Sequence, residues 1–260
     1  MSDIAIDCTI DGQPYSPEQL DRLRYVRDLH VLHQMKRLGA HIEHHGEPLS
    51  DDEIDCLSAR DAHDINVATT LAYGPQGLRE LFAEPLRASD RMWKDWNTAS
   101  AGQPLREARA ELTVTGVTLD EFRAHVTDFD ELQKLVVAAN PDHFFFCPER
   151  PGAAYAMETF GMHGPPTDVL VAVDPALPAP FGLDDGFQLL LSGHVRLTSD
   201  DTPIDIIAYH QCKPLPNGLL VKLCALFPAK TPTELVDGHK LHLAIEFAAT
   251  VEMIAAARSS

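Results

Sequence analysis

The predicted last helix constrains the fold of this chain more than any other feature of the sequence. Residues 232–257 have helical spacing, and apolar side chains occur almost all the way around the helix. Such a helix must be enclosed by the rest of the chain, because it offers solvent no continuous polar face. It nevertheless carries two ionisable side chains one turn apart, His242 and Glu246. Burying these groups costs free energy unless a partner or a bound metal ion compensates them.

The order of the preceding elements indicates what encloses this helix. A predicted strand at residues 107–117 is followed by two short helices at residues 118–126 and 130–139. Six strand-like runs follow, at residues 143–147, 153–160, 168–173, 187–198, 204–213 and 219–227. This order resembles the α+β helix-grip architecture of START-type lipid carriers and pathogenesis-related plant proteins. In that architecture a curved antiparallel sheet surrounds the last helix and leaves a cavity beside it.

The first part of the chain has a different pattern. Residues 1–104 are predicted to form a mainly helical region, and residues 105–260 the helix-grip catalytic domain. Ser16 and Gln19 form a capping box at the start of a helix over residues 16–38. Further helices are expected at residues 51–72 and 77–96. Because isolated helices are marginal in water, we expect this layer to pack over the domain and to help form a homodimer.

Charge and composition exclude several classes of function. The net charge of −18 argues against nucleic acid and anionic membranes as partners. No apolar run approaches the ~20 residues of a membrane span, and the first residues do not resemble a signal peptide. Five widely spaced cysteines form neither a disulfide framework nor a thiolate zinc site. We therefore expect a cytoplasmic protein whose partner is a small molecule.

A second His/Glu couple is predicted to face the first. His143 and Glu158 flank a turn at residues 148–152 at nearly equal distances, so they should pair across a hairpin, unless a bulge shifts the register. Together with His242 and Glu246 they would supply two imidazoles and two carboxylates, a complete ligand set for Zn²⁺. The alternative is two ordinary ion pairs, one along an exposed helix face and one between neighbouring strands.

Short motifs at these positions resemble the diacetylphloroglucinol/phloretin hydrolase family. They are Asn140-Pro141-Asp142-His143, then Ala153, Tyr155 and Met157-Glu158-Thr159, and finally His242-x-x-x-Glu246. The resemblance covers roughly the last 150 residues. It implies a helix-grip fold and a zinc ion held by His143, Glu158, His242 and Glu246. It also implies cleavage of the carbon–carbon bond between an acyl group and a phloroglucinol-type ring.

The family also places a catalytic histidine and a substrate-binding tyrosine on the sheet. His194 and Tyr209 occupy those places in order, equally far from a turn at residues 201–202. His194 is then expected to act as a general acid, and Tyr209 to hold a ring hydroxyl of an aromatic ketone substrate. If the opposite face of the sheet lines the cavity, His210 takes this position together with Ile206 and Ala208.

Two other functions are compatible with the same fold. The chain could be a non-catalytic carrier that binds an apolar or aromatic ligand in a metal-free cavity. It could also be a polyketide cyclase-like protein that uses histidine and acidic residues without a metal. A phosphate-binding glycine loop and a G-x-S-x-G motif are both absent from the sequence, which argues against nucleotide use and serine hydrolysis.

Overall fold

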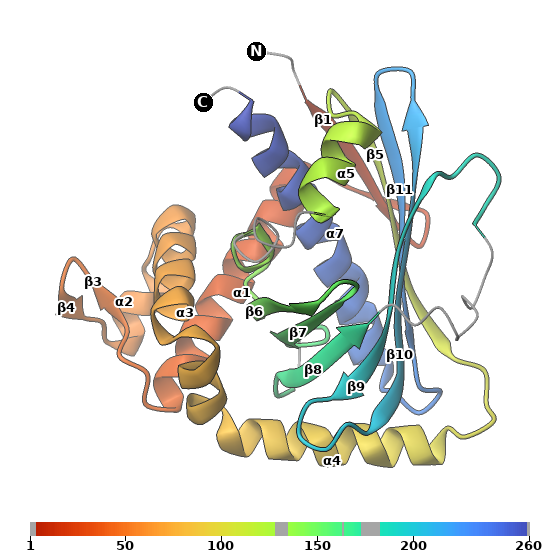
Figure 1. Ribbon diagram of the computed structural model, residues 1–260. Coiled ribbons are helices and arrows are strands. Elements are labelled where there is room, and N and C mark those ends of the chain that lie inside the picture. Colours follow the sequence, from red (N-terminus) through yellow and green to blue (C-terminus); the bar gives the residue numbers. More distant parts are fainter. Residues whose placement is uncertain (1–3, 128–134, 163, 173–182, 259–260) are drawn as a thin grey trace.

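The computed structural model describes residues 4–127, 135–162, 164–172 and 183–258. It confirms the predicted α+β class: a curved, nine-stranded antiparallel sheet surrounds the long last helix α7 (Thr233–Ala257) (Figure 1). The strand order across the sheet is β2-β1-β5-β11-β10-β9-β8-β7-β6. The strands are β1 (Ala5–Ile10), β2 (Gln13–Tyr15), β5 (Arg106–Thr115), β6 (His143–Arg150), β7 (Ala153–Glu158), β8 (Thr167–Ala172), β9 (Leu189–Leu197), β10 (Pro203–Leu215) and β11 (Gly218–Phe227).

The remaining helices lie mostly in the first hundred residues. They are α1 (Pro17–Arg37), α2 (Asp51–Asp55), α3 (Ala59–Leu81), α4 (Ala83–Ala99) and, later in the chain, α5 (Leu119–Thr127). The predicted capping box at Ser16 and Gln19 is confirmed. The helices expected at residues 51–72 and 77–96 are instead divided at residues 56–58 and 82, and α3 is kinked at Gly74. The helix predicted at residues 130–139 lies partly outside the described residues. Its described part, residues 135–139, is helical.

The sheet begins earlier in the chain than the sequence pattern predicts. Strands β1 and β2 lie in the region predicted to be mainly helical, and β1 pairs with β5. The sheet therefore continues across the predicted division at residue 104. Asp11 and Gly12 join the two strands with positive φ angles of 51° and 74°. An Asp-Gly turn after an alternating segment is a strong hairpin signal, and it predicts this element.

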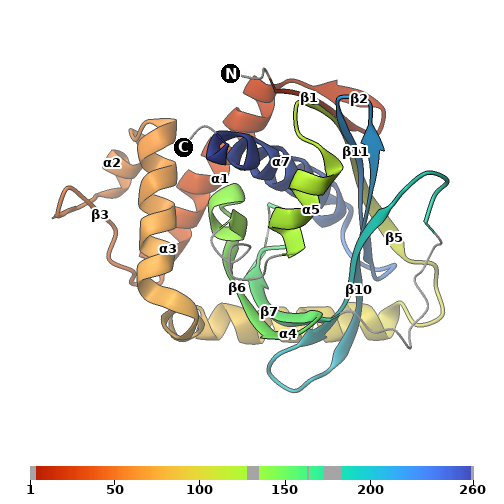
Figure 2. The ribbon, with the colours of Figure 1, turned by 45° about the horizontal axis from the view of Figure 1, so that its top comes forward.

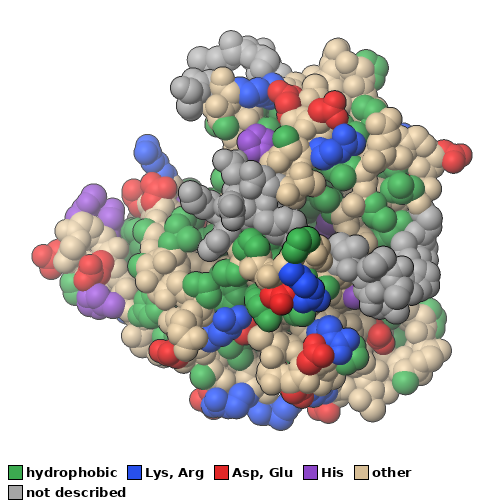
Figure 3. Space-filling view, viewed as in Figure 1, with side chains coloured by type: hydrophobic (Ala, Val, Ile, Leu, Met, Phe, Trp, Pro, Cys, Tyr) green, Lys and Arg blue, Asp and Glu red, His purple; other side chains and the backbone are tan. Residues whose placement is uncertain are grey.

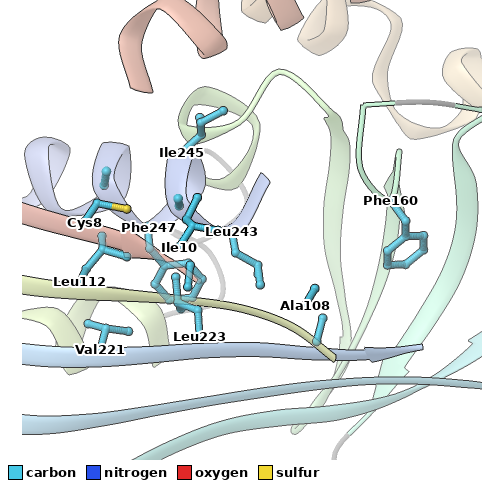
Figure 4. Packing of buried hydrophobic residues seen from close by; sticks show 14 of the residues in the cluster. Cys8, Ile10, Ala108, Leu112, Phe160, Val221, Leu223, Leu243, Ile245 and Phe247 are labelled. Carbon is cyan, nitrogen blue, oxygen red and sulfur yellow. The ribbon is translucent and has the colours of Figure 1, made fainter. Parts of the chain in front are cut away.

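The main core lies between the sheet and α7. Cys8 and Ile10 of β1 are buried in the same cluster as Leu243 and Phe247 of α7, and they lie close together in Figure 4. Residues from both parts of the chain thus form one hydrophobic core. Burial on all sides of α7 agrees with its apolar sequence, since α1 covers the helix on the side away from β5 (Figure 2).

The helices α3 and α4 cover strands at the far end of the sheet. Helix α3 packs on β6, where Phe82 meets Phe144 at a ring-centroid distance of 4.8 Å. Helix α4 runs under β8 and β10 (Figure 1), and the indole N–H of Trp93 donates a hydrogen bond to Thr167 of β8. Within the described ranges, every helix is too short or too polar to cross a membrane.

Candidate metal centre

The hairpin β6–β7 places His143 opposite Glu158, as the sequence predicts. Its turn is tighter than expected, because Arg150 already pairs with Ala153, and Gly152 has a positive φ of 77°. Two register shifts follow, each of which accommodates one extra residue in β6. The shifts bring His143 opposite Glu158, with His143 Nε2 2.9 Å from Glu158 Oε2.

The last helix brings the second couple to the same point. His242 Nε2 is 2.9 Å from His143 Nε2 and 3.4 Å from Glu158 Oε2. Glu246, one turn further along α7, has its Oε2 atom 3.7 Å from His242 Nε2 and 4.0 Å from His143 Nε2. The four predicted metal ligands therefore come together, two from the sheet and two from the helix. His143, Glu158 and His242 are the most tightly grouped, with ligand atoms within 4.8 Å of one another.

These distances fit the size of a zinc site. Four ligand atoms at about 2.1 Å from a tetrahedrally bound Zn²⁺ lie about 3.4 Å from one another. The two histidine nitrogens lie 2.9 Å from each other and 2.9 to 4.0 Å from the oxygens of Glu158 and Glu246. Imidazole nitrogen and carboxylate oxygen are also the donor atoms that Zn²⁺ binds. The alternative of two separate ion pairs, one on the helix and one between strands, does not require all four groups to lie at one point.

Groups behind the two imidazoles orient them. His143 Nδ1 is 3.3 Å from the carbonyl oxygen of Val136, so a proton on Nδ1 is donated there and Nε2 faces the other ligands. His242 Nδ1 lies on the side of the Asp142 carboxylate, with 3.8 Å between Nδ1 and Oδ2. Metal-bound histidines in proteins usually have such an oxygen on the nitrogen that does not bind the metal.

The electrostatics of the cluster favour one buried positive charge and one buried negative charge. Burial opposes charge on His143, but Glu246 and Glu158 outweigh it and raise the pKa of His143 to about 9. Burial likewise opposes charge on Glu158, yet the two histidines hold the pKa of Glu158 well below its usual value. Burial lowers the pKa of His242 and raises the pKa of Glu246. A divalent cation would compensate carboxylates that the protein alone neutralises only in part.

A cavity of ≈ 310 Å³ opens beside this cluster, between α7 and the concave face of the sheet. Its walls are mainly apolar and aromatic. They include Phe145, Phe146, Phe160, Val171, Leu190, Leu191, Val195, Ile206, Leu243 and Phe247. The polar lining side chains beyond the four candidate ligands are His210, His239, Ser192 and Thr250, and the described lining contains no lysine or arginine.

The two sheet residues expected to be catalytic do not meet this cavity. His194 pairs with Ile207 rather than with Tyr209. The pairing of Pro203 with Arg196 centres the turn on residues 199–200 instead of 201–202, and the register shift between Ile204 and Ile207 makes up only part of this difference. Neither His194 nor Tyr209 is among the described residues that line the cavity, and Tyr209 is buried in a separate cluster with Cys224. The expectation failed because it assigned the polar face of the strands to the cavity wall. The cavity is lined by the apolar face, as in most sheets with one face on the core.

His210 lies on the apolar face of β10, the face that lines the cavity. The backbone N–H of Cys224 donates to His210 Nδ1 at 3.3 Å, so the proton of the neutral imidazole is on Nε2. Burial lowers the pKa of His210 to about 4, which keeps the ring neutral near pH 7. Its ring contacts Phe247 of α7, with 5.0 Å between centroids. His210 is thus fixed beside the cavity as a neutral hydrogen-bond donor.

His239 is a further histidine of the site whose role the sequence did not indicate. It lies on α7 before His242, and the two rings stack with 4.6 Å between centroids. Burial, together with nearby His242, holds the pKa of His239 well below its ordinary value. Its alignment with His242 and Glu246 along the predicted helix was the available signal.

The other histidine-rich segment lies at the surface. His44 and His45 stack on each other at the hairpin of β3 (Glu43–His44) and β4 (Glu47–Pro48), and histidine side chains are visible on this lobe in Figure 3. Across the described parts of the chain, the grouping of three or more potential metal ligands is the one at His143, Glu158 and His242.

Comparison with known proteins adds little to this geometry. No family model matches the chain, and no curated protein matches it. Among solved structures, Ara h 8.0201 is similar over 58% of this chain and 97% of its own, with 14% identity and a TM-score of 0.40. Protein Ms6760 from Mycobacterium smegmatis is similar over 57% of this chain and 89% of its own, with 12% identity and a TM-score of 0.36. Likenesses at these values carry no conclusion about what this protein does.

Proposed function

We propose that this protein is a zinc-dependent hydrolase of carbon–carbon bonds in ketones. Its substrate would carry an acyl group on a phloroglucinol-type ring or in a β-diketone-like arrangement. The observation that carries the proposal is the convergence of His143, Glu158, His242 and Glu246 at the wall of an apolar cavity. When bound there, Zn²⁺ would polarise a carbonyl group or lower the pKa of a water molecule.

The chain's own residues would supply binding and hydrogen bonding. The aromatic and aliphatic walls would hold the acyl group and the ring, and would exclude bulk water. Hydrolysis adds a hydroxyl group to the acyl carbon and a proton to the ring carbon that leaves. Both come from one water molecule. His210 has its Nε2 proton available to a carbonyl or ring oxygen, and it takes the place of His194 at the cavity wall as a hydrogen-bond donor, not as a general acid. The hydroxyl of Ser192 is a further partner for a ring hydroxyl, in place of Tyr209.

The cavity also restricts the charge and size of the substrate. Because the described lining contains neither lysine nor arginine, an anionic substrate would have no cationic side chain to pair with. The volume of ≈ 310 Å³ lies near the lower end of ligand pockets, which span about 300–1,000 Å³. We therefore propose a small, neutral, largely apolar aromatic ketone.

The direct test combines metal control with substrate screening. Zinc-loaded protein is mixed with acylphloroglucinols and simple β-diketones, and the loss of absorbance of the conjugated ketone is recorded. We expect turnover that EDTA abolishes and added Zn²⁺ restores, and Glu246→Gln should reduce it. Equal rates with and without EDTA would contradict the proposal.

A second candidate function is supported by the apolar character of the cavity walls. A non-catalytic carrier needs such walls and no metal, and a metal-free polyketide cyclase-like protein would use His210 in the same cavity. These functions predict that an aromatic ligand still binds in EDTA with unchanged affinity. The cyclase further predicts conversion of a polyketide-like substrate in EDTA, whereas the carrier predicts none.

A further inference from the structure

An arginine of the N-terminal region reaches the back of the candidate metal centre. Arg27, on α1, is 1% exposed and forms an ion pair with Asp142, which is 2% exposed. Asp142 directly precedes His143 in the chain, and its Oδ2 atom faces Nδ1 of His242. One carboxylate thus lies between a cation from the first helix and an imidazole of the last helix.

Arg27 also contacts the last helix directly. Its Nη2 atom donates a hydrogen bond of 3.1 Å to the carbonyl oxygen of Gly238, one turn before His242. A guanidinium group can bridge two acceptors in this way because its donors form a rigid, planar fork. Arg27 therefore holds both the backbone of α7 and the carboxylate that faces His242.

Two buried polar atoms face each other at this point. Among the described residues, neither the buried Nδ1 of His242 nor Oδ2 of Asp142 has a hydrogen-bond partner, although Oδ2 takes part in the ion pair with Arg27. The 3.8 Å between these two atoms is longer than a hydrogen bond. On its other side, His242 Nε2 lies 2.9 Å from His143 Nε2. A proton on Nδ1 would face the Asp142 carboxylate and leave the lone pair of Nε2 free for the metal.

We propose that Arg27 and Asp142 are positioning residues that hold His242 in its Nδ1-protonated form, with Nε2 directed at the metal. The proposal rests on the metal-dependent function above and assigns a role in it to helix α1. Without Arg27, the Asp142 carboxylate would be a buried charge lacking a cation. Without Asp142, the Nδ1 proton of His242 would face no acceptor, and the other tautomer would compete.

The test uses a double variant, because a single change would leave a buried charge unpaired. Arg27→Met with Asp142→Leu replaces the ion pair by apolar side chains of similar size, which proteins often tolerate without loss of stability. The matched control is Arg79→Met with Asp168→Leu. That pair also joins an N-terminal helix to the sheet, at 2.6 Å, but contacts none of the four ligands. Asp142→Asn, which keeps the size of the side chain but leaves Arg27 without its anionic partner, is a second variant in case the double variant does not fold.

Two quantities are measured on the full chain at pH 7.5. The dissociation constant for Zn²⁺ comes from competition with a chromophoric chelator. The tautomer of His242 in zinc-free protein comes from the imidazole ¹⁵N chemical shifts, which distinguish protonated from bare nitrogens. We expect the double variant to bind Zn²⁺ ~10–100-fold more weakly, as loss of an outer-shell partner usually causes. It should also lose the preference for the Nδ1 proton, while the Arg79/Asp168 variant changes neither quantity.

The outcomes separate this inference from the metal-dependent function. Wild-type protein that binds Zn²⁺, with unchanged affinity and tautomer in the double variant and in Asp142→Asn, would overturn the positioning role and leave the metal site intact. A second outcome is that the wild-type protein binds no Zn²⁺, while the double variant loses the preference for the Nδ1 proton. This outcome would support the positioning contact and overturn the metal-dependent function. A weaker affinity in the control pair equal to that in the Arg27/Asp142 variant would also overturn the positioning role.

Discussion

The Nε2 atoms of His143 and His242 lie 2.9 Å apart, although one residue begins a strand and the other lies within the last helix. Two imidazole nitrogens at this distance need either a proton or a cation between them. In the zinc-free protein, His143 carries this proton near neutral pH because its pKa is raised to about 9. In the zinc-bound protein, the metal would take that position, and His143 would have to be neutral.

Zinc binding should therefore depend on pH in a defined direction. His143 has a pKa of about 9 in the zinc-free protein, so near pH 7.5 it must release a proton when Zn²⁺ binds. We expect the apparent affinity to rise with pH up to about 9, with close to one proton released per zinc. Calorimetry in buffers of different ionisation enthalpy measures this release. An affinity that stays constant between pH 6.5 and 8.5 would contradict the assigned protonation of His143.

Loss of a ligand on α7 should remove the metal. In His242→Ala and Glu246→Ala we expect zinc affinity to fall by more than the ~10–100-fold that an outer-shell change costs, with circular dichroism almost unchanged. His194→Ala is the matched control, because His194 lies outside the described cavity lining. Normal zinc content in either α7 variant would show that the helix couple does not bind metal.

The assignment of the cavity face is tested at His210. We expect His210→Ala to lower turnover by ~10²–10³-fold, the usual cost of removing a preorganised hydrogen-bond donor, with zinc content unchanged. His194→Ala should retain near-normal turnover. The opposite order of effects, measured as kcat for the same ketone, would return the catalytic role to His194.

His210 should also contribute to the acid sensitivity of the zinc-free protein. Its pKa is about 4 in the folded state and near 6.5 in the unfolded chain, so the unfolded chain binds the proton first as the pH falls. The stability that neutral His210 permits is present above pH 6.5 and is lost between pH 6.5 and 4. At about 1.4 kcal/mol per pKa unit, the loss is on the order of 3 kcal/mol. Urea unfolding at both pH values should show a smaller fall in His210→Gln, and an equal fall would contradict the burial of a neutral ring.

The N-terminal region should be required for folding and for the site. Removal of residues 1–102 would expose the edge of β5 that pairs with β1, and would remove Trp93 and Arg27 from buried positions. We expect aggregation or an altered oligomeric state in size-exclusion chromatography, and loss of zinc binding. A soluble, monomeric fragment with normal zinc affinity would show that this region is an independent appendage. The homodimer remains a prediction that the same chromatography of the intact chain tests.

The sequence predicted elements whose pattern is local, and it was less successful where the exact turn position and bulges together set the register. The burial of residues 232–257 followed from their apolar pattern, and the structure confirms it. The pairing of His143 with Glu158 was also confirmed, although the tight turn and the two shifts in β6 compensate each other in a way that counting could not foresee. In the β9–β10 hairpin, the turn is centred two residues earlier than expected, and the shift next to Ile207 compensates for only part of this, so His194 does not face Tyr209.

The cavity face and the first hairpin each have a local signal in the sequence, and the signal for the cavity face supported only the alternative with His210. Ile206 and Ala208 mark the apolar face of β10, and a sheet surrounding a buried helix turns that face inward. Asp11-Gly12 marks the turn between β1 and β2. The contact of Arg27 with Asp142 joins residues far apart in the chain, and no local pattern predicts it.

The metal content of the purified full-length protein tests the central claim most directly. After incubation with excess Zn²⁺ and removal of free ions, mass spectrometry of the metal should give about one zinc per chain, since the four ligands form one site. The His242→Ala variant, treated in the same way, should contain little. Less than about half an equivalent of zinc or another transition metal in the wild-type protein would contradict the account.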